Sequence, residues 1–122
     1  MQKPSCQDDQ VLIKVDCAVL NPSDVLFLSG KTNQPKEYPF TPGWEGAGTI
    51  VEVGKAVDAS WVGKRVGFNR QNEQEYKTGG AMAEFCVTRP RECIPLRDET
   101  TLEQGVALFV NPLSALCMIH RC

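Results

Sequence analysis

Apolar and polar residues alternate along the first clear element of the chain, residues 11–20. Every odd position from Val11 to Val19 is apolar, whereas Lys14 and Asp16 lie between them. A period of two predicts a β-strand with one buried face. Residues 65–68 and 82–87 are further apolar stretches of strand length, and another apolar run at 49–53 ends at Gly54. The pattern predicts several short strands.

Proline, glycine and small polar residues separate these strands. Asn21-Pro22-Ser23-Asp24 ends the first strand, because proline cannot donate to a β-ladder and the other three residues favour turns. Residues 25–28 predict one helical turn ended by Gly30. Three prolines within 31–43 predict an irregular loop, and a polar loop spans 69–80.

A helical pattern begins near residue 100. Thr100 and Glu103 have the spacing of a capping box, and Leu102, Val106 and Phe109 follow at helical intervals. A first C-terminal helix is predicted here.

A second helix is predicted to start at Asn111, as its N-cap, with Pro112 at the first helical position. Strands, tight turns and two terminal helices together predict a β-barrel-like domain with a helical exit. We expect residues 1–96 to form this domain and residues 97–122 to lead toward a further domain. The chain is interpreted as a piece of a longer protein.

Composition limits the kinds of partner that the chain is expected to bind. The 122 residues carry 13 Lys+Arg and 15 Asp+Glu, a net charge of −2, so no basic excess indicates nucleic-acid binding. The most apolar stretch, residues 106–119, is interrupted by Asn111, Pro112 and Ser114 and is shorter than the roughly 18 residues of a membrane span. Neither nucleic acid nor a membrane is an expected partner.

Six cysteines allow three disulfides in principle, but the chain has long apolar strands and no apolar leader segment, which favours reduced thiols in the cytosol. A mitochondrial location stays open. The nearest metal-like cluster is Cys117, His120 and Cys122. On a helix Cys122 would leave the face shared by the other two, so a structural cysteine and a surface histidine are favoured over a metal site.

Gly43, Gly46 and Gly48 allow the backbone to approach another strand or a ligand closely. Their Gly-x-x-Gly-x-Gly spacing precedes a strand, whereas a dinucleotide-binding turn has Gly-x-Gly-x-x-Gly between a strand and a helix. This cluster is interpreted as a turn or barrel feature, not as a phosphate-binding loop.

Five segments in register, 20–24, 42–48, 62–66, 83–85 and 111–115, resemble the GroES-like catalytic domain of medium-chain dehydrogenases/reductases, in its zinc-free quinone oxidoreductase branch. The resemblance covers nearly the whole chain. It implies a mainly β (α+β) domain, a GroES-like partly open β-barrel with short helices and two C-terminal helices. It also implies a parent enzyme that uses NAD(P)H, with NADPH slightly favoured, to reduce quinones or α,β-unsaturated carbonyls.

The resemblance further implies that no zinc is bound. Zinc members of the family hold the metal with a Cys and a His, and here those positions are Asn21 and Trp44. An indole cannot ligate zinc and an amide is a poor ligand. Because the chain carries no dinucleotide-binding turn, we expect it to bind no cofactor and to be inactive alone.

Carried over by position, Asn21 is the leading candidate, as a catalytic residue on the nicotinamide side of the cofactor or as a turn residue. Asp24 is a candidate to orient Asn21, or a helix cap. Glu45 and Trp44 are candidates on the substrate side, with a structural ion pair as the other interpretation of Glu45. Thr32 takes the place of a proton-donating tyrosine of enoyl reductases, although its hydroxyl is a poor acid near neutral pH.

Two further expectations remain. A non-catalytic GroES-like binding or interaction module is the rival interpretation, since a fold does not dictate function. We also expect self-association through exposed apolar surface.

Overall fold

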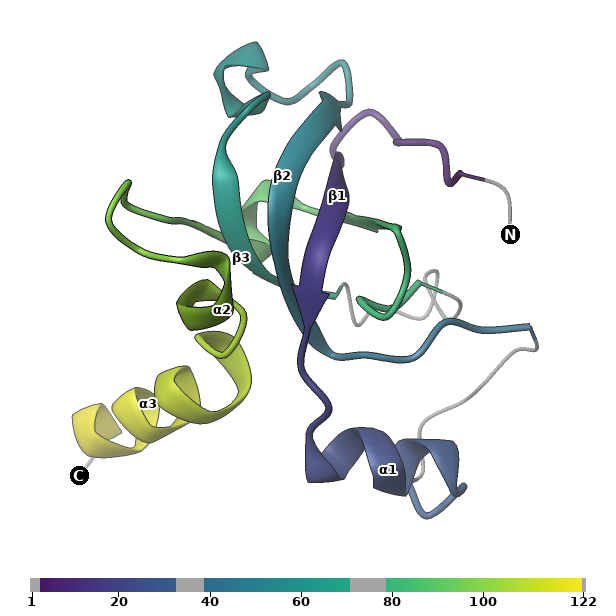
Figure 1. The fold of residues 1–122 in the computed structure, drawn as a ribbon, viewed down its shortest axis with the longest axis vertical. Helices are drawn as coiled ribbons and strands as arrows, with labels where there is room; N and C mark the ends of the chain where they lie inside the picture. Colours follow the sequence, from purple (N-terminus) through teal and green to yellow (C-terminus); the bar gives the residue numbers. More distant parts are fainter. Residues whose placement is uncertain (1–2, 33–38, 71–78, 122) are drawn as a thin grey trace.

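The computed structural model describes residues 3–32, 39–70 and 79–121. Within them, antiparallel strands form one curled sheet in the order β4-β1-β2-β3-β5, which does not close into a barrel (Figure 1). This confirms the predicted mainly β, partly open architecture. The strands are β1 (Val11–Ala18), β2 (Glu45–Val53), β3 (Arg65–Asn69), β4 (Phe85–Thr88) and β5 (Cys93–Pro95).

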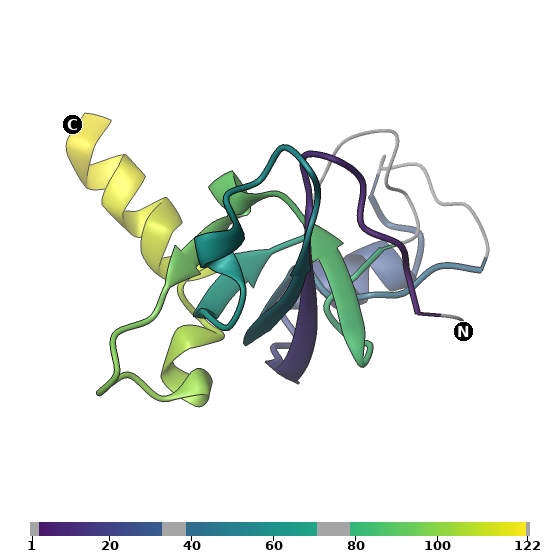
Figure 2. The same cartoon turned by 90° about the horizontal axis from the view of Figure 1, so that it is seen from above.

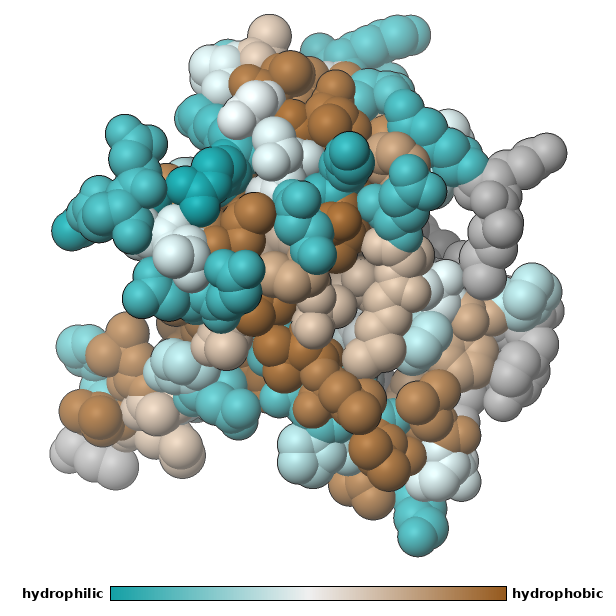
Figure 3. Space-filling view, in the orientation of Figure 1, coloured by the Kyte–Doolittle hydropathy of each residue, from teal (hydrophilic) through white to brown (hydrophobic). Residues whose placement is uncertain are grey.

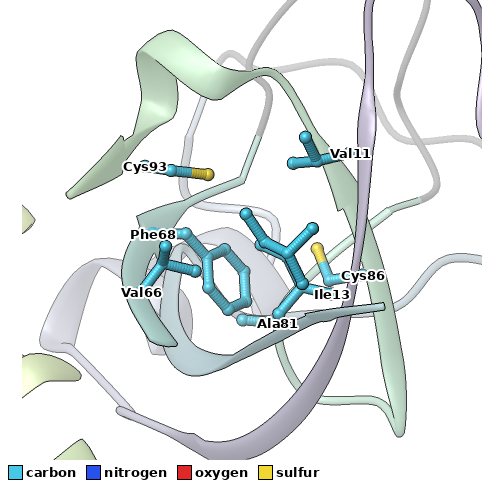
Figure 4. Close-up of a cluster of buried hydrophobic side chains, with 8 residues drawn as sticks. Val11, Ile13, Val66, Phe68, Ala81, Cys86 and Cys93 are labelled. Carbon is cyan, nitrogen blue, oxygen red and sulfur yellow. The ribbon is translucent and has the colours of Figure 1, made fainter. Parts of the chain in front are cut away.

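The core lies inside the curl of the sheet (Figure 4). Val11 and Ile13 of β1 are fully buried there, as their odd positions predict. Leu12, between them in the sequence, is also fully buried. The short helix α2 (Leu102–Gly105) packs against β1, β2 and β3. The core cluster consists of Val11, Ile13, Ile50, Val66, Phe68, Ala81, Cys86 and Cys93.

Several predicted boundaries need correction. β1 ends at Ala18 rather than residue 20, and β4 begins at Phe85 rather than 82. The helix α1 spans Pro22–Leu28 and starts three residues before the predicted turn, because Pro22 takes the first helical position. β5 and two 3₁₀ turns, Ala59–Trp61 and Pro90–Glu92, carry no clear periodicity and were not predicted.

The capping box of α2 lies one residue later than predicted. Thr101, not Thr100, is the N-cap: its hydroxyl accepts the N–H of Gln104 at 3.2 Å, and the Gln104 side chain accepts the N–H of Thr101 at 3.0 Å. Thr100 and Glu103 fit the same sequence rule, so the pattern alone does not choose between the two registers.

The second terminal helix also starts earlier than predicted. A π-helical turn at Phe109–Leu113 leads directly into α3 (Ser114–Arg121), and Pro112 lies inside this helical segment. Asn111 is therefore not an N-cap. A wider π-type turn accommodates a proline whose missing N–H would interrupt an ordinary α-helix.

α3 projects away from the sheet (Figure 2). All its residues are exposed, with Leu116, Met118 and Ile119 the large apolar ones. A second apolar area lies over α1 and the chain leading to it (Figure 3), where Leu20, Val25, Leu26 and Leu28 are exposed. No helix in the described ranges is both long enough and apolar enough to cross a bilayer.

The glycine cluster allows strands to approach one another. A side chain at Gly48 would collide with the carbonyl oxygen of Lys14 on β1, and one at Gly46 would meet the ring of Phe68 on β3. The predicted close approach is therefore to neighbouring strands.

The five described cysteines are free thiols, and the described residues contain no cluster of three or more potential metal ligands. The predicted loops include residues 33–38 and 71–78, and the considered metal cluster includes Cys122. These residues lie outside the described part of the chain.

Candidate functional site

Asn21 lies at the junction between β1 and α1 and is 4% exposed. The Nδ2 group donates to Glu45 Oε1 at 2.9 Å, and the Oδ1 atom accepts from Asn111 Nδ2 at 3.4 Å. Asn21 thus connects the start of β2 with the C-terminal helical segment.

Glu45 is the first residue of β2 and is 1% exposed. Besides the Asn21 amide, its carboxylate binds the start of the helical segment, because Oε2 accepts the backbone N–H groups of Phe109 at 3.1 Å and Val110 at 3.0 Å. A buried carboxylate requires such donors, and helix-start N–H groups favour negative charge. Among the described residues these neutral donors, rather than a cation, hold Glu45.

Asp24 is equally buried and joins α1 to the segment before β2. Its Oδ2 atom accepts the N–H of Asn21 at 2.8 Å, which caps α1, and its Oδ1 atom accepts the N–H of Trp44 at 3.1 Å. Asp24 therefore fixes the backbone of both Asn21 and Trp44.

Trp44 belongs to an aromatic stack around the guanidinium group of Arg70. The Arg70 Cζ atom lies 3.9 Å from the centre of the Trp44 ring and 5.1 Å from that of Phe27. The rings of Phe27 and Trp44 are 5.6 Å apart, and Phe40 packs edge-on against Phe27. Burial lowers the pKa of Arg70, whereas the negative charge of Asp24 opposes this shift.

Thr32 lies apart from this network. It is half-buried, and its hydroxyl has no hydrogen-bond partner in the described part of the chain. No described hydrogen bond connects Thr32 with Asn21, Asp24, Trp44 or Glu45, so the structure gives it no shared role with them.

An open groove runs beside the network. Asn21 and Glu45 do not line it, whereas Trp44 forms part of its wall. A molecule in this groove would meet a mixed surface, with two aromatic rings and two aliphatic side chains beside five polar or charged residues. Its lining residues are Ser23, Trp44, Asn69, Arg91, Glu92, Phe109, Val110, Leu113 and Ser114.

The structure brings four of the five predicted site residues together: Asn21, Asp24, Trp44 and Glu45. Two participants were missed by sequence reasoning. Asn111 resembled a helix cap, and Arg70, at the end of β3, had no distinguishing pattern around it. Their roles depend on contacts with residues far away in the sequence.

Comparison with known proteins agrees with this fold. Residues 7–98 match the alcohol dehydrogenase GroES-like domain. A quinone oxidoreductase of Rattus norvegicus is 35% identical over 113 residues, which are 92% of this chain and 32% of that protein. A chloroplastic quinone-oxidoreductase homologue of Spinacia oleracea is 32% identical over 114 residues, 92% of this chain and 33% of that protein.

A solved structure gives the same picture. A Mesorhizobium loti protein assigned as an NADPH:quinone reductase superposes with a TM-score of 0.86 at 42% identity, over 97% of this chain and 33% of that one. The fold and its buried network define a GroES-like domain. The chain belongs to the alcohol dehydrogenase GroES-like domain family and spans about a third of the length of these relatives.

Proposed function

We propose that this chain is the substrate-side domain of a zinc-independent, NAD(P)H-dependent oxidoreductase that reduces quinones or α,β-unsaturated carbonyl compounds. For a quinone the reaction would be quinone + NAD(P)H + H⁺ → hydroquinone + NAD(P)⁺. The supporting observation is the buried network of Asn21, Glu45 and Asn111 in a domain whose relatives are quinone oxidoreductases.

Zinc independence is supported by the chemistry of the residues at the two implied ligand positions. Asn21 uses its amide on Glu45 and Asn111, and Trp44 offers an indole. Neither is a suitable ligand for Zn²⁺, which prefers thiolate, imidazole and carboxylate. The carboxylate of Glu45 is already occupied by N–H donors on both oxygens.

The described residues fit only the nicotinamide end of the cofactor. One of the two side-chain N–H groups of Asn21 donates to Glu45, and the other can donate to the nicotinamide end of the cofactor. Neighbouring strands occupy the space beside Gly46 and Gly48, so these glycines do not form a binding loop for the phosphates. When bound, NAD(P)H would supply a hydride. We propose that another domain of the parent holds its phosphates, with NADPH slightly favoured over NADH.

The proposed function is tested by comparing two proteins. One is this 122-residue chain alone, and the other is the same chain followed by a nucleotide-binding domain, either from its own reading frame or fused from the Rattus norvegicus relative. We expect NADPH oxidation with duroquinone only by the longer protein, unchanged by a zinc chelator. Activity of the short chain above a heat-treated control, loss of activity on chelation, or inactivity of every folded longer protein would contradict the proposal.

Three accompanying proposals concern the chain as a whole. We propose a domain boundary near residue 96, a cytosolic location, and self-association through the exposed apolar side chains of α3, with a second copy of the chain as the partner. The exposed fractions of Leu116 (50%), Met118 (64%) and Ile119 (73%) support the last of these.

A further inference from the structure

Arg70 is a buried cation that has no hydrogen-bonded counter-ion among the described residues. Arg70 is 5% exposed, and its Nε atom is fully buried with no hydrogen-bond partner in the described part of the chain. No described residue accepts a hydrogen bond from its guanidinium group. Burying such a group unpaired is unfavourable, so a buried donor of this kind requires an explanation.

The two buried carboxylates of the Asn21 network do not meet this need. Both oxygens of Asp24 accept backbone N–H groups, and both oxygens of Glu45 accept N–H groups of Asn21, Phe109 and Val110. Asp24 stabilises the charge of Arg70 only through space. The guanidinium is instead held by the faces of the Trp44 and Phe27 rings, which leaves its N–H edge uncommitted.

A second unsatisfied donor lies beside it. The indole Nε1 of Trp44 is fully buried, without a hydrogen-bond partner in residues 3–32, 39–70 and 79–121, and the Trp44 ring stacks on Arg70. Both atoms can only donate a hydrogen bond. This part of the molecule therefore has an excess of donors and needs an acceptor.

Charge decides the kind of acceptor. The positive charge of Arg70 is already opposed by the negative charge of Asp24, so an additional anion would leave an uncompensated buried charge. A neutral oxygen acceptor satisfies the donors without that cost. A carbonyl oxygen is such an acceptor, and it gains negative charge when the carbonyl compound is reduced, which a guanidinium stabilises.

We propose that Arg70 is a substrate-binding catalytic residue that donates a hydrogen bond to the carbonyl oxygen of the quinone or enone and stabilises the negative charge that develops there. The proposal rests on the proposed function and deepens it, because it supplies a charged donor where Thr32 offers only a hydroxyl. The oxygen subsequently takes its proton from solvent, since a guanidinium keeps its own protons near neutral pH.

The test measures binding without NADPH, so its outcome is independent of the activity assay above. Duroquinone is the probe, because its fully substituted ring does not add protein thiols readily. The ¹⁵Nε–¹Hε signal of Arg70 is followed by NMR, and Trp44 fluorescence is followed in a Trp61→Phe background. We expect duroquinone to shift the Arg70 signal and to quench Trp44, whereas benzoate, an anion with a ring of similar size, does neither.

Variants separate a direct contact from a structural role. Arg70→Gln is expected to weaken duroquinone binding by roughly tenfold or more, and Arg70→Lys, which keeps the charge but loses the planar fork, by less. Arg97→Gln, at an arginine whose side chain is 86% exposed, is the matched control and should bind as the unmodified chain does. Circular dichroism reports whether each variant folds.

Three results would overturn the proposal: an unchanged Arg70 signal at saturating duroquinone, undiminished binding by a folded Arg70→Gln variant, or tighter binding of benzoate than of duroquinone. The first is measured on the unmodified chain, so the proposal stays open to refutation even if the variants fail to fold.

Discussion

The carboxylate of Glu45 and the backbone N–H of Val110 lie 3.0 Å apart, although 65 positions separate them in the sequence. This bond joins the first residue of β2 to the start of the final helical segment. Because the same carboxylate also holds the amide of Asn21, one buried charge sets the positions of two parts of the candidate site.

Replacing Glu45 by glutamine should loosen this junction. A glutamine has one oxygen and one NH₂ group, so it cannot accept all three N–H groups, and its own NH₂ must face a donor. We expect a loss of about 2 kcal/mol in the free energy of unfolding. Urea denaturation measures this loss, and hydrogen exchange should accelerate at the amides of Phe109 and Val110.

Glu99→Gln is the matched control, since the Glu99 side chain is 74% exposed. It should change the free energy of unfolding by less than about 0.5 kcal/mol. Equal stability of the Glu45 and Glu99 variants would show that the buried contacts of Glu45 do not stabilise the fold.

Asn21→Asp should make the free energy of unfolding lower at pH 7 than at acidic pH. The substitution removes the N–H that Glu45 accepts and places a second carboxylate against it. Two ionised carboxylates repel, so this variant should be less stable at pH 7 and should recover as acidification neutralises one of them. Thermal unfolding between pH 4 and pH 8 measures the effect relative to the unmodified chain.

Adding Glu45→Gln to Asn21→Asp should remove the repulsion and flatten the pH dependence. A double variant that keeps the full pH dependence of the single one would place its origin elsewhere in the molecule.

The buried thiols predict a loss of stability in alkali. Burial raises the pKa of Cys86 and of Cys93 to about 12, from 9.0 for a free thiol. Their folded-state pKa exceeds the unfolded one, so their contribution to stability is complete below pH 9 and is lost as the pH rises toward 12. In this pH range each thiol lowers the free energy of unfolding by at most about 1.4 kcal/mol per pH unit.

Urea denaturation at pH 8, 9.5 and 11 in the presence of a reductant measures this slope. Cys86→Ala should reduce the slope, whatever the cavity does to the absolute stability, whereas Cys117→Ser on the exposed α3 should leave the slope unchanged. If the slope is unchanged in Cys86→Ala, other groups cause the loss of stability at alkaline pH.

Self-association should depend on α3. Leu116→Lys combined with Ile119→Lys places charge in the exposed apolar face and should shift the chain toward monomer in sedimentation at high concentration. Val62→Lys is the matched control, because Val62 is 50% exposed but lies beside the 3₁₀ turn at Ala59–Trp61. Association that persists in the α3 variant would exclude this face as the contact.

Sequence periodicity predicted the strands that have one buried face, because alternation reports directly on burial. It failed for β5, whose three residues are too few to show a period, and for the register of α2, where Thr100 and Thr101 satisfy the same rule. Motif order found Asn21, Asp24, Trp44 and Glu45, since each lies in a segment with a recognisable pattern.

The remaining site residues could not be predicted locally. Asn111 precedes a proline, so the helix-cap rule applied to it. In the structure it lies inside a π-helical turn, and its side chain donates to Asn21. Arg70 takes its role from two rings that come from different segments, Phe27 and Trp44. Such roles follow from the folded topology rather than from neighbouring residues.

The hydrogen bond between Asn21 and Asn111 spans 90 positions, and those from Glu45 span 24 to 65. Contacts between residues so distant in sequence carry a loop-closure entropy cost, and they slow folding. The Asn21 network consequently cannot assemble in a growing chain until residue 111 has been synthesised. The candidate site is therefore complete only when the two ends of the domain have come together.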